Sequence, residues 1–169
     1  MDIKEIGRKA LKYDKYSGCS QSVLLALQEA FNIGDMESFK AATVLSGGVA
    51  RKGETCGALI GGLLALGLVV GREDMTDTQT YRDAMQPSDE IIKEFQKRLQ
   101  ETFGFDEPLD NTICREIQRR IYGEGFDLTD PDSYKAFLDA GGHGDEGCPL
   151  VCGVAAEVTA DKILELISV

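Results

Sequence analysis

The longest stretch of the chain without a charged side chain reads Thr55-Cys56-Gly57-Ala58-Leu59-Ile60-Gly61-Gly62-Leu63-Leu64-Ala65-Leu66-Gly67-Leu68-Val69-Val70-Gly71. A membrane span needs ~20 apolar residues. This run is shorter and holds a cysteine and five glycines, so we expect a buried central helix and no membrane insertion. Each glycine inside a helix costs ~1 kcal/mol relative to alanine. Glycines kept at such positions indicate that a neighbouring helix or a bound group approaches the backbone closely.

Amphipathic patterns predict further helices on both sides of this run, with apolar residues repeating at spacings of three and four. The expected helices are 3–15, 17–31 capped by Ser17, 36–45 capped by Asp35, 55–71 capped by Thr55, 78–104 as one helix or two broken at Pro87, one from Asp110 or Thr112 to Gly123, 131–138, and 148 to the C-terminus. No alternating run typical of a strand occurs. We therefore predict an all-α fold, a compact bundle of about six to eight helices around the central helix, in a single domain over residues 1–169.

The composition is that of an ordinary globular protein with an acidic surface. The 169 residues have a mass of 18.4 kDa, which suits one domain. With 18 basic and 29 acidic side chains the net charge is −11, so nucleic acid and anionic membrane surfaces are poor partners. The single histidine, His143, excludes sites that need two histidines. The sequence opens without an apolar leader and is not rich in cysteine, so we expect a cytoplasmic protein.

The cysteines share one feature, because each falls at or near the start of an expected helix. They are Cys19, Cys56, Cys114, Cys148 and Cys152. A helix N-terminus carries about +0.5 charge and free N–H groups, which stabilise a thiolate and lower its pKa. Thiolates act as redox nucleophiles and also bind iron–sulfur clusters and other thiophilic metals. The same residues also suit a simpler role, since free cysteine often fills a core as a small apolar side chain.

Neighbouring residues indicate more specific roles for two of the cysteines, Cys148 and Cys56. Cys148 and Cys152 are four residues apart and lie on one helix face, which suits two ligands of one metal or a redox pair. His143 precedes Cys148 in a glycine-rich loop and is either a further ligand or proton donor, or an exposed loop side chain. Arg51 and Lys52 shortly precede Cys56. They either lower its pKa further or are solvated loop charges.

The cysteine order, together with the element Cys56-Gly57-Ala58-Leu59-Ile60-Gly61, resembles the C_GCAxxG_C_C family of redox-active proteins. The resemblance runs from about residue 10 to residue 165 and includes Gly18-Cys19-Ser20-Gln21-Ser22-Val23, Thr55 to Gly62, Ala65-Leu66-Gly67-Leu68, Phe103-Gly104, Cys114-Arg115-Glu116-Ile117, Cys148-Pro149-Leu150-Val151 and Ala155-Ala156. It implies a redox role and four redox or ligand cysteines, which are Cys19, Cys56, Cys114 and Cys148. Cys152 is then an addition to the family pattern.

These features predict a cytoplasmic redox-active protein, either a thiol-based or metal-dependent oxidoreductase or an electron-transfer protein, that exchanges electrons with a partner protein. In a thiol/disulfide form, Cys56 would be the attacking thiolate, and Cys148 or Cys19 would resolve the mixed disulfide. In a metal form, an iron–sulfur cluster or another thiophilic metal would be held by Cys19, Cys56, Cys114 and Cys148, with Cys152 or His143 nearby.

A second hypothesis comes from a different class of protein. The chain would be a non-catalytic helical module that binds a protein or a small ligand and keeps its cysteines in the core. Its acidic surface would suit a basic partner. Small residues on the central helix would also suit a homodimer interface.

Overall fold

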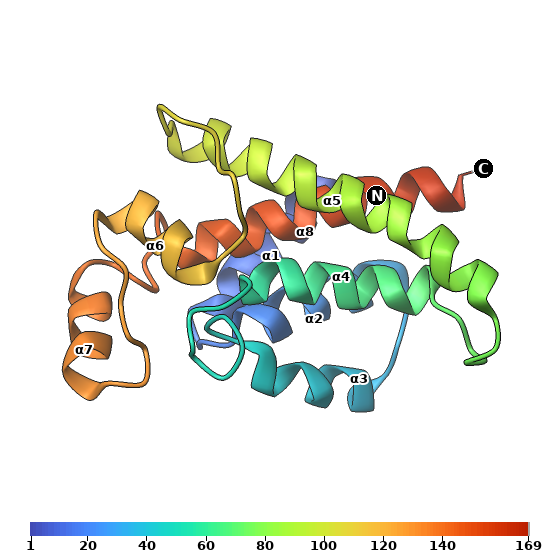
Figure 1. Cartoon of the computed structure of the whole chain (residues 1–169), viewed down its shortest axis with the longest axis horizontal. Helices are drawn as coiled ribbons and strands as arrows, with labels where there is room; N and C mark the ends of the chain where they lie inside the picture. The colour runs from blue at the N-terminus through green and yellow to red at the C-terminus, as the bar shows by residue number, and fades with distance from the viewer. Residues whose placement is uncertain (169) are drawn as a thin grey trace.

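The prediction of an all-α fold is confirmed by the computed structural model, which describes residues 1–168. Within these residues the chain forms α-helices, one short 3-10 helix and a single isolated β-bridge (Figure 1). The helices are α1 (Ile3–Asp14), α2 (Cys19–Phe31), α3 (Met36–Ala41), the 3-10 helix η1 (Ala42–Leu45), α4 (Gly57–Val70), α5 (Thr78–Phe103), α6 (Cys114–Tyr122), α7 (Pro131–Asp139) and α8 (Cys148–Ile167).

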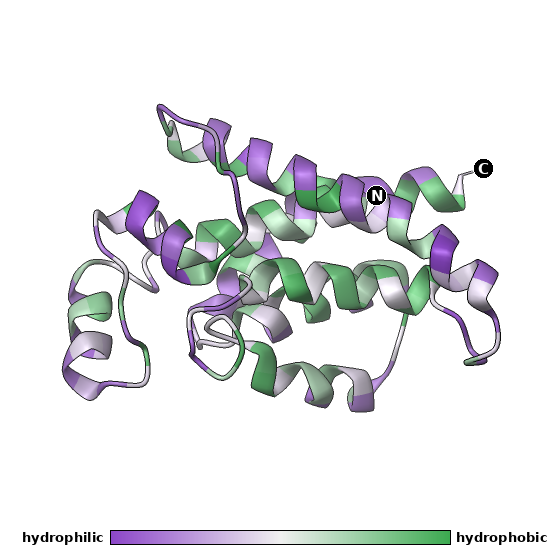
Figure 2. Cartoon of the chain, viewed as in Figure 1, coloured by the Kyte–Doolittle hydropathy of each residue, from purple (hydrophilic) through white to green (hydrophobic). Residues whose placement is uncertain are grey.

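The apolar helix α4 packs between α2, α5 and α8, and α1 packs along α2 and α8. Figure 2 shows α4 as an almost unbroken hydrophobic ribbon, whereas α5 carries hydrophilic residues on its outer side. The buried stripe of α5 is Ile91, Phe95 and Leu99, which are spaced by four as the sequence predicts. Pro87 lies inside α5 without dividing it, so this segment is one helix.

The glycines of α4 are explained by close contact with two neighbouring helices. A Cβ atom on Gly61 would overlap the carbonyl oxygen of Ser20 in α2, and one on Gly62 would overlap the hydroxyl of Thr159 in α8. Glycine at these positions therefore lets α2 and α8 approach α4 to backbone distance. The prediction of close approach to a neighbouring helix is confirmed.

Three expected caps are wrong, although the helices they should start are present. The N-cap of α2 is Gly18, at a φ of 99°, instead of Ser17. Cys56 replaces Thr55 as the N-cap of α4, because Thr55 pairs with Ile113 in an antiparallel bridge. Ile113 is itself the N-cap of α6, instead of Asp110 or Thr112. The expected helix 36–45 is divided into α3 and η1.

A left-handed turn follows η1 and is the most strained segment of the backbone. Its φ angles are 66° at Gly47, 68° at Gly48, 59° at Val49, 50° at Ala50 and 62° at Arg51. Left-handed conformations cost roughly 1–2 kcal/mol for each residue that has a Cβ atom. The turn is held by backbone hydrogen bonds, including those from Ala50 N–H to Val44 O (2.9 Å) and from Arg51 N–H to Ser46 O (3.1 Å).

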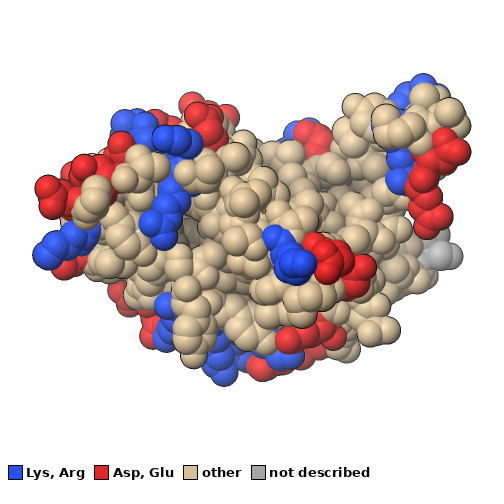
Figure 3. Space-filling model, turned by 90° about the horizontal axis from the view of Figure 1, so that it is seen from below, with Lys and Arg blue, Asp and Glu red and all other residues tan. Residues whose placement is uncertain are grey.

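The surface divides into charged margins and a broad uncharged face. Viewed from the side of α3 and η1, most of the molecule in Figure 3 carries neither acidic nor basic groups. Met36 and Val44, from these two segments, are about two-thirds exposed. No helix among the described residues is long and apolar enough to cross a membrane.

Candidate functional site

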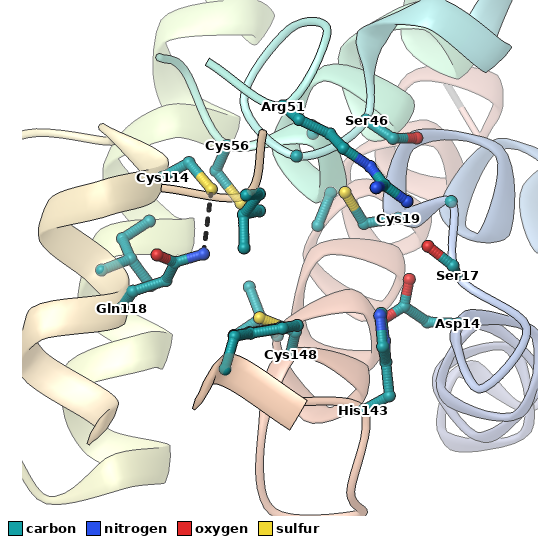
Figure 4. Close-up of a pocket in the computed structure, with 18 of the residues that line it drawn as sticks. Asp14, Ser17, Cys19, Ser46, Arg51, Cys56, Cys114, Gln118, His143 and Cys148 are labelled. Atoms are coloured by element: carbon teal, nitrogen blue, oxygen red, sulfur yellow. Dashed lines mark hydrogen bonds and ion pairs between the residues drawn. The ribbon is translucent and has the colours of Figure 1, made fainter. Parts of the chain in front are cut away.

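Four helix starts converge at one end of the bundle and bring four cysteines to a single cavity (Figure 4). Cys19 is the first residue of α2, Cys56 is the N-cap of α4, Cys114 is the first residue of α6, and Cys148 is the first residue of α8. The centre of a water molecule can occupy about 60 Å³ of this cavity. This volume is enough for several waters or a small bound group.

Backbone pairing holds Cys56 beside Cys114. Cys56 N–H donates to Thr112 O (2.8 Å), and Cys114 N–H donates to Glu54 O (2.6 Å). The segments that precede α4 and α6 therefore run antiparallel for a few residues. This pairing fixes two residues that are far apart in sequence on the same wall of the cavity.

Gly57 makes room for the sulfur of Cys19. A Cβ atom on Gly57 would lie 2.5 Å from Cys19 Sγ and 3.0 Å from the carbonyl oxygen of Leu45. The glycine that follows Cys56 in the family motif thus allows α2 and α4 to start side by side, with their two cysteines at the cavity.

Tyr122 forms hydrogen bonds with the fourth cysteine, Cys148. Cys148 N–H donates to the Tyr122 hydroxyl oxygen (2.9 Å), and the hydroxyl hydrogen can be donated to Cys148 Sγ (3.4 Å) or to Gly142 O (3.2 Å). A Cβ atom on Gly147 would lie 2.6 Å from the same hydroxyl oxygen. Sequence analysis missed Tyr122 as a site residue, because nothing in its spacing connects it with a cysteine.

Gln118 contacts the sulfur of Cys114 from one turn along α6. Its Nε2 lies 3.8 Å from Cys114 Sγ, and its Oε1 accepts a hydrogen bond from Phe126 N–H (3.0 Å). The side chain is buried, so both of its polar ends are used within the site. Sequence analysis missed Gln118. The four-residue spacing from Cys114 was the one available signal.

The prediction of lowered cysteine pKa values is wrong in this structure. Burial raises the pKa of all five thiols, and that of Cys148 to about 12. The helix-start effect is present at Cys56, where the N–H groups of Leu59 and Ala58 lower the pKa, but removal of the thiol from water outweighs it. Arg51 lines the cavity and stacks on the Tyr134 ring, with its guanidinium carbon 4.7 Å from the ring centroid.

Cys152 and His143 stand apart from the four-cysteine arrangement. Cys152 is fully buried in the main apolar core and does not line the cavity, and its Sγ lies 4.0 Å from the carbonyl oxygen of Cys19. His143 does line the cavity, but its Nδ1 faces the carboxyl group of Asp14 at 3.5 Å. Over residues 1–168, no three His, Cys, Asp or Glu side chains are grouped so that they could hold a metal ion.

Asp14 is a third site residue that sequence analysis missed. It is the last residue of α1 and lines the cavity with 1% of its side chain exposed. In Figure 4 the carboxyl group of Asp14 lies with His143 and Ser17 on one side of the cavity, while Cys56, Cys114 and Gln118 lie on the other. The side of the cavity formed by Asp14, Ser17 and His143 is thus a polar wall.

An all-helical fold with four cysteines gathered at one cavity defines a class of cysteine-motif proteins. The family model described as "Putative redox-active protein (C_GCAxxG_C_C)" matches residues 17–162. The chain therefore belongs to the C_GCAxxG_C_C family, as the resemblance predicted. No curated protein and no solved structure shows a detectable match to the chain.

Proposed function

We propose that this protein transfers electrons through an iron–sulfur cluster held by Cys19, Cys56, Cys114 and Cys148. One observation carries the proposal, namely that four cysteines from four separate segments line the same cavity. A thiol/disulfide couple needs two cysteines, whereas four thiolates are the usual ligand set of an iron–sulfur cluster.

No three of the described His, Cys, Asp or Glu side chains are grouped to hold a single metal ion, so the proposal rests on the chemistry of the donor set, which is four cysteine side chains at one cavity. Apolar side chains such as Ile117 and Val151 line part of the cavity, and Cys56 and Cys114 are buried, which shields these two sulfurs from bulk water. Hydrogen-bond donors lie against two of the sulfurs, the Tyr122 hydroxyl at Cys148 and the Gln118 amide at Cys114. Such bonds stabilise thiolates and tune the reduction potential of a cluster. When bound, the cluster would supply one-electron chemistry. The protein would supply ligands, exclusion of water and electrostatic tuning.

The burial of the thiols favours this form over thiol/disulfide exchange. Exchange is fastest when the attacking thiol has a pKa near the ambient pH. Burial raises the pKa of Cys56, the expected attacking thiol, and raises that of Cys19 and Cys148 as well. A bound metal centre would instead deprotonate its cysteine ligands directly.

The compartment and the partner are part of the same proposal. All five cysteines are free, which fits a reducing compartment such as the cytoplasm. The net charge of −11 favours a redox partner that presents basic side chains.

The test is the absorption spectrum and the iron and acid-labile sulfide content of protein purified without oxygen. We expect a broad absorption near ~400 nm that reductant bleaches. Replacing any of the four cavity cysteines by serine, as in Cys56→Ser, should abolish it. Cys152→Ser is the matched control, because Cys152 is buried but lies outside the cavity.

Three results would contradict the proposal. A Cys56→Ser variant that keeps the wild-type iron and sulfide content would exclude the four-cysteine ligand set. A colourless, iron-free wild-type protein with one reversible disulfide would favour the thiol/disulfide form. Native thiols that are unreactive and bind no metal would favour the non-catalytic helical module.

A further inference from the structure

The polar wall of the cavity holds a buried carboxyl group without a hydrogen-bond partner among the described residues. Asp14 has 1% of its side chain exposed, and neither of its carboxyl oxygens has a hydrogen-bond partner among the described residues. Buried polar groups in folded proteins are nearly always hydrogen-bonded. A structural aspartate would satisfy its oxygens with backbone N–H groups, as the exposed Asp35 does at the start of α3.

The position of Asp14 on its helix also disfavours a negative charge. Asp14 ends α1, where the helix dipole is negative. Asp2 and Glu5, at the opposite end of α1, occupy the favourable positions for acidic residues. Burial is the largest cause that raises the pKa of Asp14, while His143 and Cys152 act in the opposite direction. The net effect of these surroundings is that the pKa of Asp14 is raised.

Asp14 interacts with one imidazole, with three of the four cavity cysteines and with two further titratable side chains. The charge of Asp14 acts on Cys19 from α2, Cys56 from the start of α4, Tyr122 from α6, and Cys148 and Cys152 from α8. Arg51 approaches from the left-handed turn. The adjacent Lys15 is engaged elsewhere, because its Nζ pairs with Asp145 at 2.6 Å.

His143 connects this buried carboxyl to the surface. Its Nδ1 lies 3.5 Å from Asp14 Oδ2, which is within ion-pair range but long for a hydrogen bond. About a fifth of its side chain is exposed, whereas Asp14 is closed to solvent. Phe137 holds the ring edge-to-face, with the ring centroids 5.4 Å apart. His143 is therefore a partly exposed titratable group that lies beside the buried carboxyl.

We infer that Asp14 and His143 are the proton acceptor of the redox site, so that electron uptake at the four cysteines is coupled to proton uptake at this pair. When an external one-electron donor reduces the site, the cavity gains one electron, and the Asp14–His143 pair binds one proton from solvent. Reoxidation returns the electron to an acceptor and the proton to solvent. The net charge of the buried cavity is then the same in both states, which avoids an uncompensated charge in a low-dielectric region. This inference rests on the proposed function.

The experiment is a potentiometric titration of the protein with its native centre, followed by visible absorption from about pH 5 to pH 9, a range that includes the ordinary titration of histidine. The variants are Asp14→Asn and His143→Gln. Asp145→Asn is the control, since Asp145 is an exposed acidic residue close to His143 in the sequence. We expect the midpoint potential of wild type and control to fall as the pH rises. Most of that slope should be lost in Asp14→Asn, and a large part of it in His143→Gln.

The outcomes separate the inference from the proposed function. A reversible couple whose pH dependence is unchanged in Asp14→Asn would overturn the inference and leave the electron-transfer proposal intact. Absence of any couple in the wild-type protein would overturn both. Far-ultraviolet circular dichroism verifies that Asp14→Asn is folded. If it is not, His143→Gln decides the question, because this substitution lies in a loop outside α1, and an unchanged slope there overturns the inference.

Discussion

The middle of helix α4 and its N-terminal end contact the protein in opposite ways. Along its middle, Gly61 and Gly62 leave no space for even a methyl group between α4 and the helices on either side. At its N-terminal end the same helix borders a cavity that holds an unpartnered carboxyl group, and the nearby turn at residues 47–51 is left-handed. The difference indicates that the middle of α4 is built for stability. The N-terminal end departs from ordinary packing where the chemistry is expected.

The largest expected effect comes from adding a methyl group to the closely packed middle of α4. Gly61→Ala should lower the free energy of unfolding by about 1–3 kcal/mol, because its Cβ atom would meet the Ser20 backbone. Gly67→Ala is the matched control in the same helix, since nothing lies within 4 Å of that position. It should raise stability by ~0.5–1 kcal/mol. Urea unfolding of both variants checks the prediction, and equal effects would contradict the described packing of α4.

The second largest effect is expected at Gly57, where a substitution should change both the stability of the fold and the redox centre. Gly57→Ala should cost about 1–2 kcal/mol of stability and should also disturb the redox centre, because the new methyl group would overlap Cys19 Sγ. Absorption near ~400 nm and urea unfolding are measured on the same samples. A Gly57→Ala protein with a wild-type spectrum would show that Cys19 is not held against α4 in the working site.

A smaller effect is expected in the strained turn. Val49→Gly should stabilise the protein by about 1 kcal/mol, because Val49 has a φ of 59° and glycine adopts this conformation without steric cost. The side chain is more than one-third exposed, so little packing is lost. Thermal unfolding of Val49→Gly and wild type checks this, and a clear loss of stability would contradict the assignment of strain to the turn.

The smallest effect is a pH dependence that originates at Asp14. Its pKa is raised in the folded protein, so near pH ~3.9, where the unfolded aspartate also binds a proton, the residue has little effect on stability. As the pH rises through the folded-state pKa, the buried carboxylate becomes charged and the protein loses stability. The stability of Asp14→Asn relative to wild type should therefore increase over this interval and then level off. A difference that does not vary with pH would contradict the raised pKa.

The sequence predicted most of the fold because apolar spacing and glycines report directly on helices. The apolar stripe of Ile91, Phe95 and Leu99 predicted helix α5. Gly61 and Gly62 indicated that neighbouring helices pack closely against α4. Caps were less predictable. Thr55 has the chemistry of a cap, but it is used in the bridge to Ile113, and this long-range pairing leaves no local signal.

The site was predictable only in its cysteines. Their placement at helix starts and the family pattern selected the four that line the cavity. Asp14 lines the cavity and Tyr122 contacts Cys148, but neither belongs to a motif, and they reach the site because α1 and α6 end there. The direction of the cysteine pKa values was wrong because the sequence shows the helix N-termini but not the depth of burial, which has the larger effect.

The central claim is that the four cavity cysteines together hold an iron–sulfur centre. Its most direct test is iron K-edge X-ray absorption of wild-type protein purified without oxygen. The account predicts that sulfur atoms are the nearest neighbours of every iron, as for a cluster with four thiolate ligands. The absence of stoichiometric iron, or iron bound by oxygen or nitrogen atoms, would contradict it.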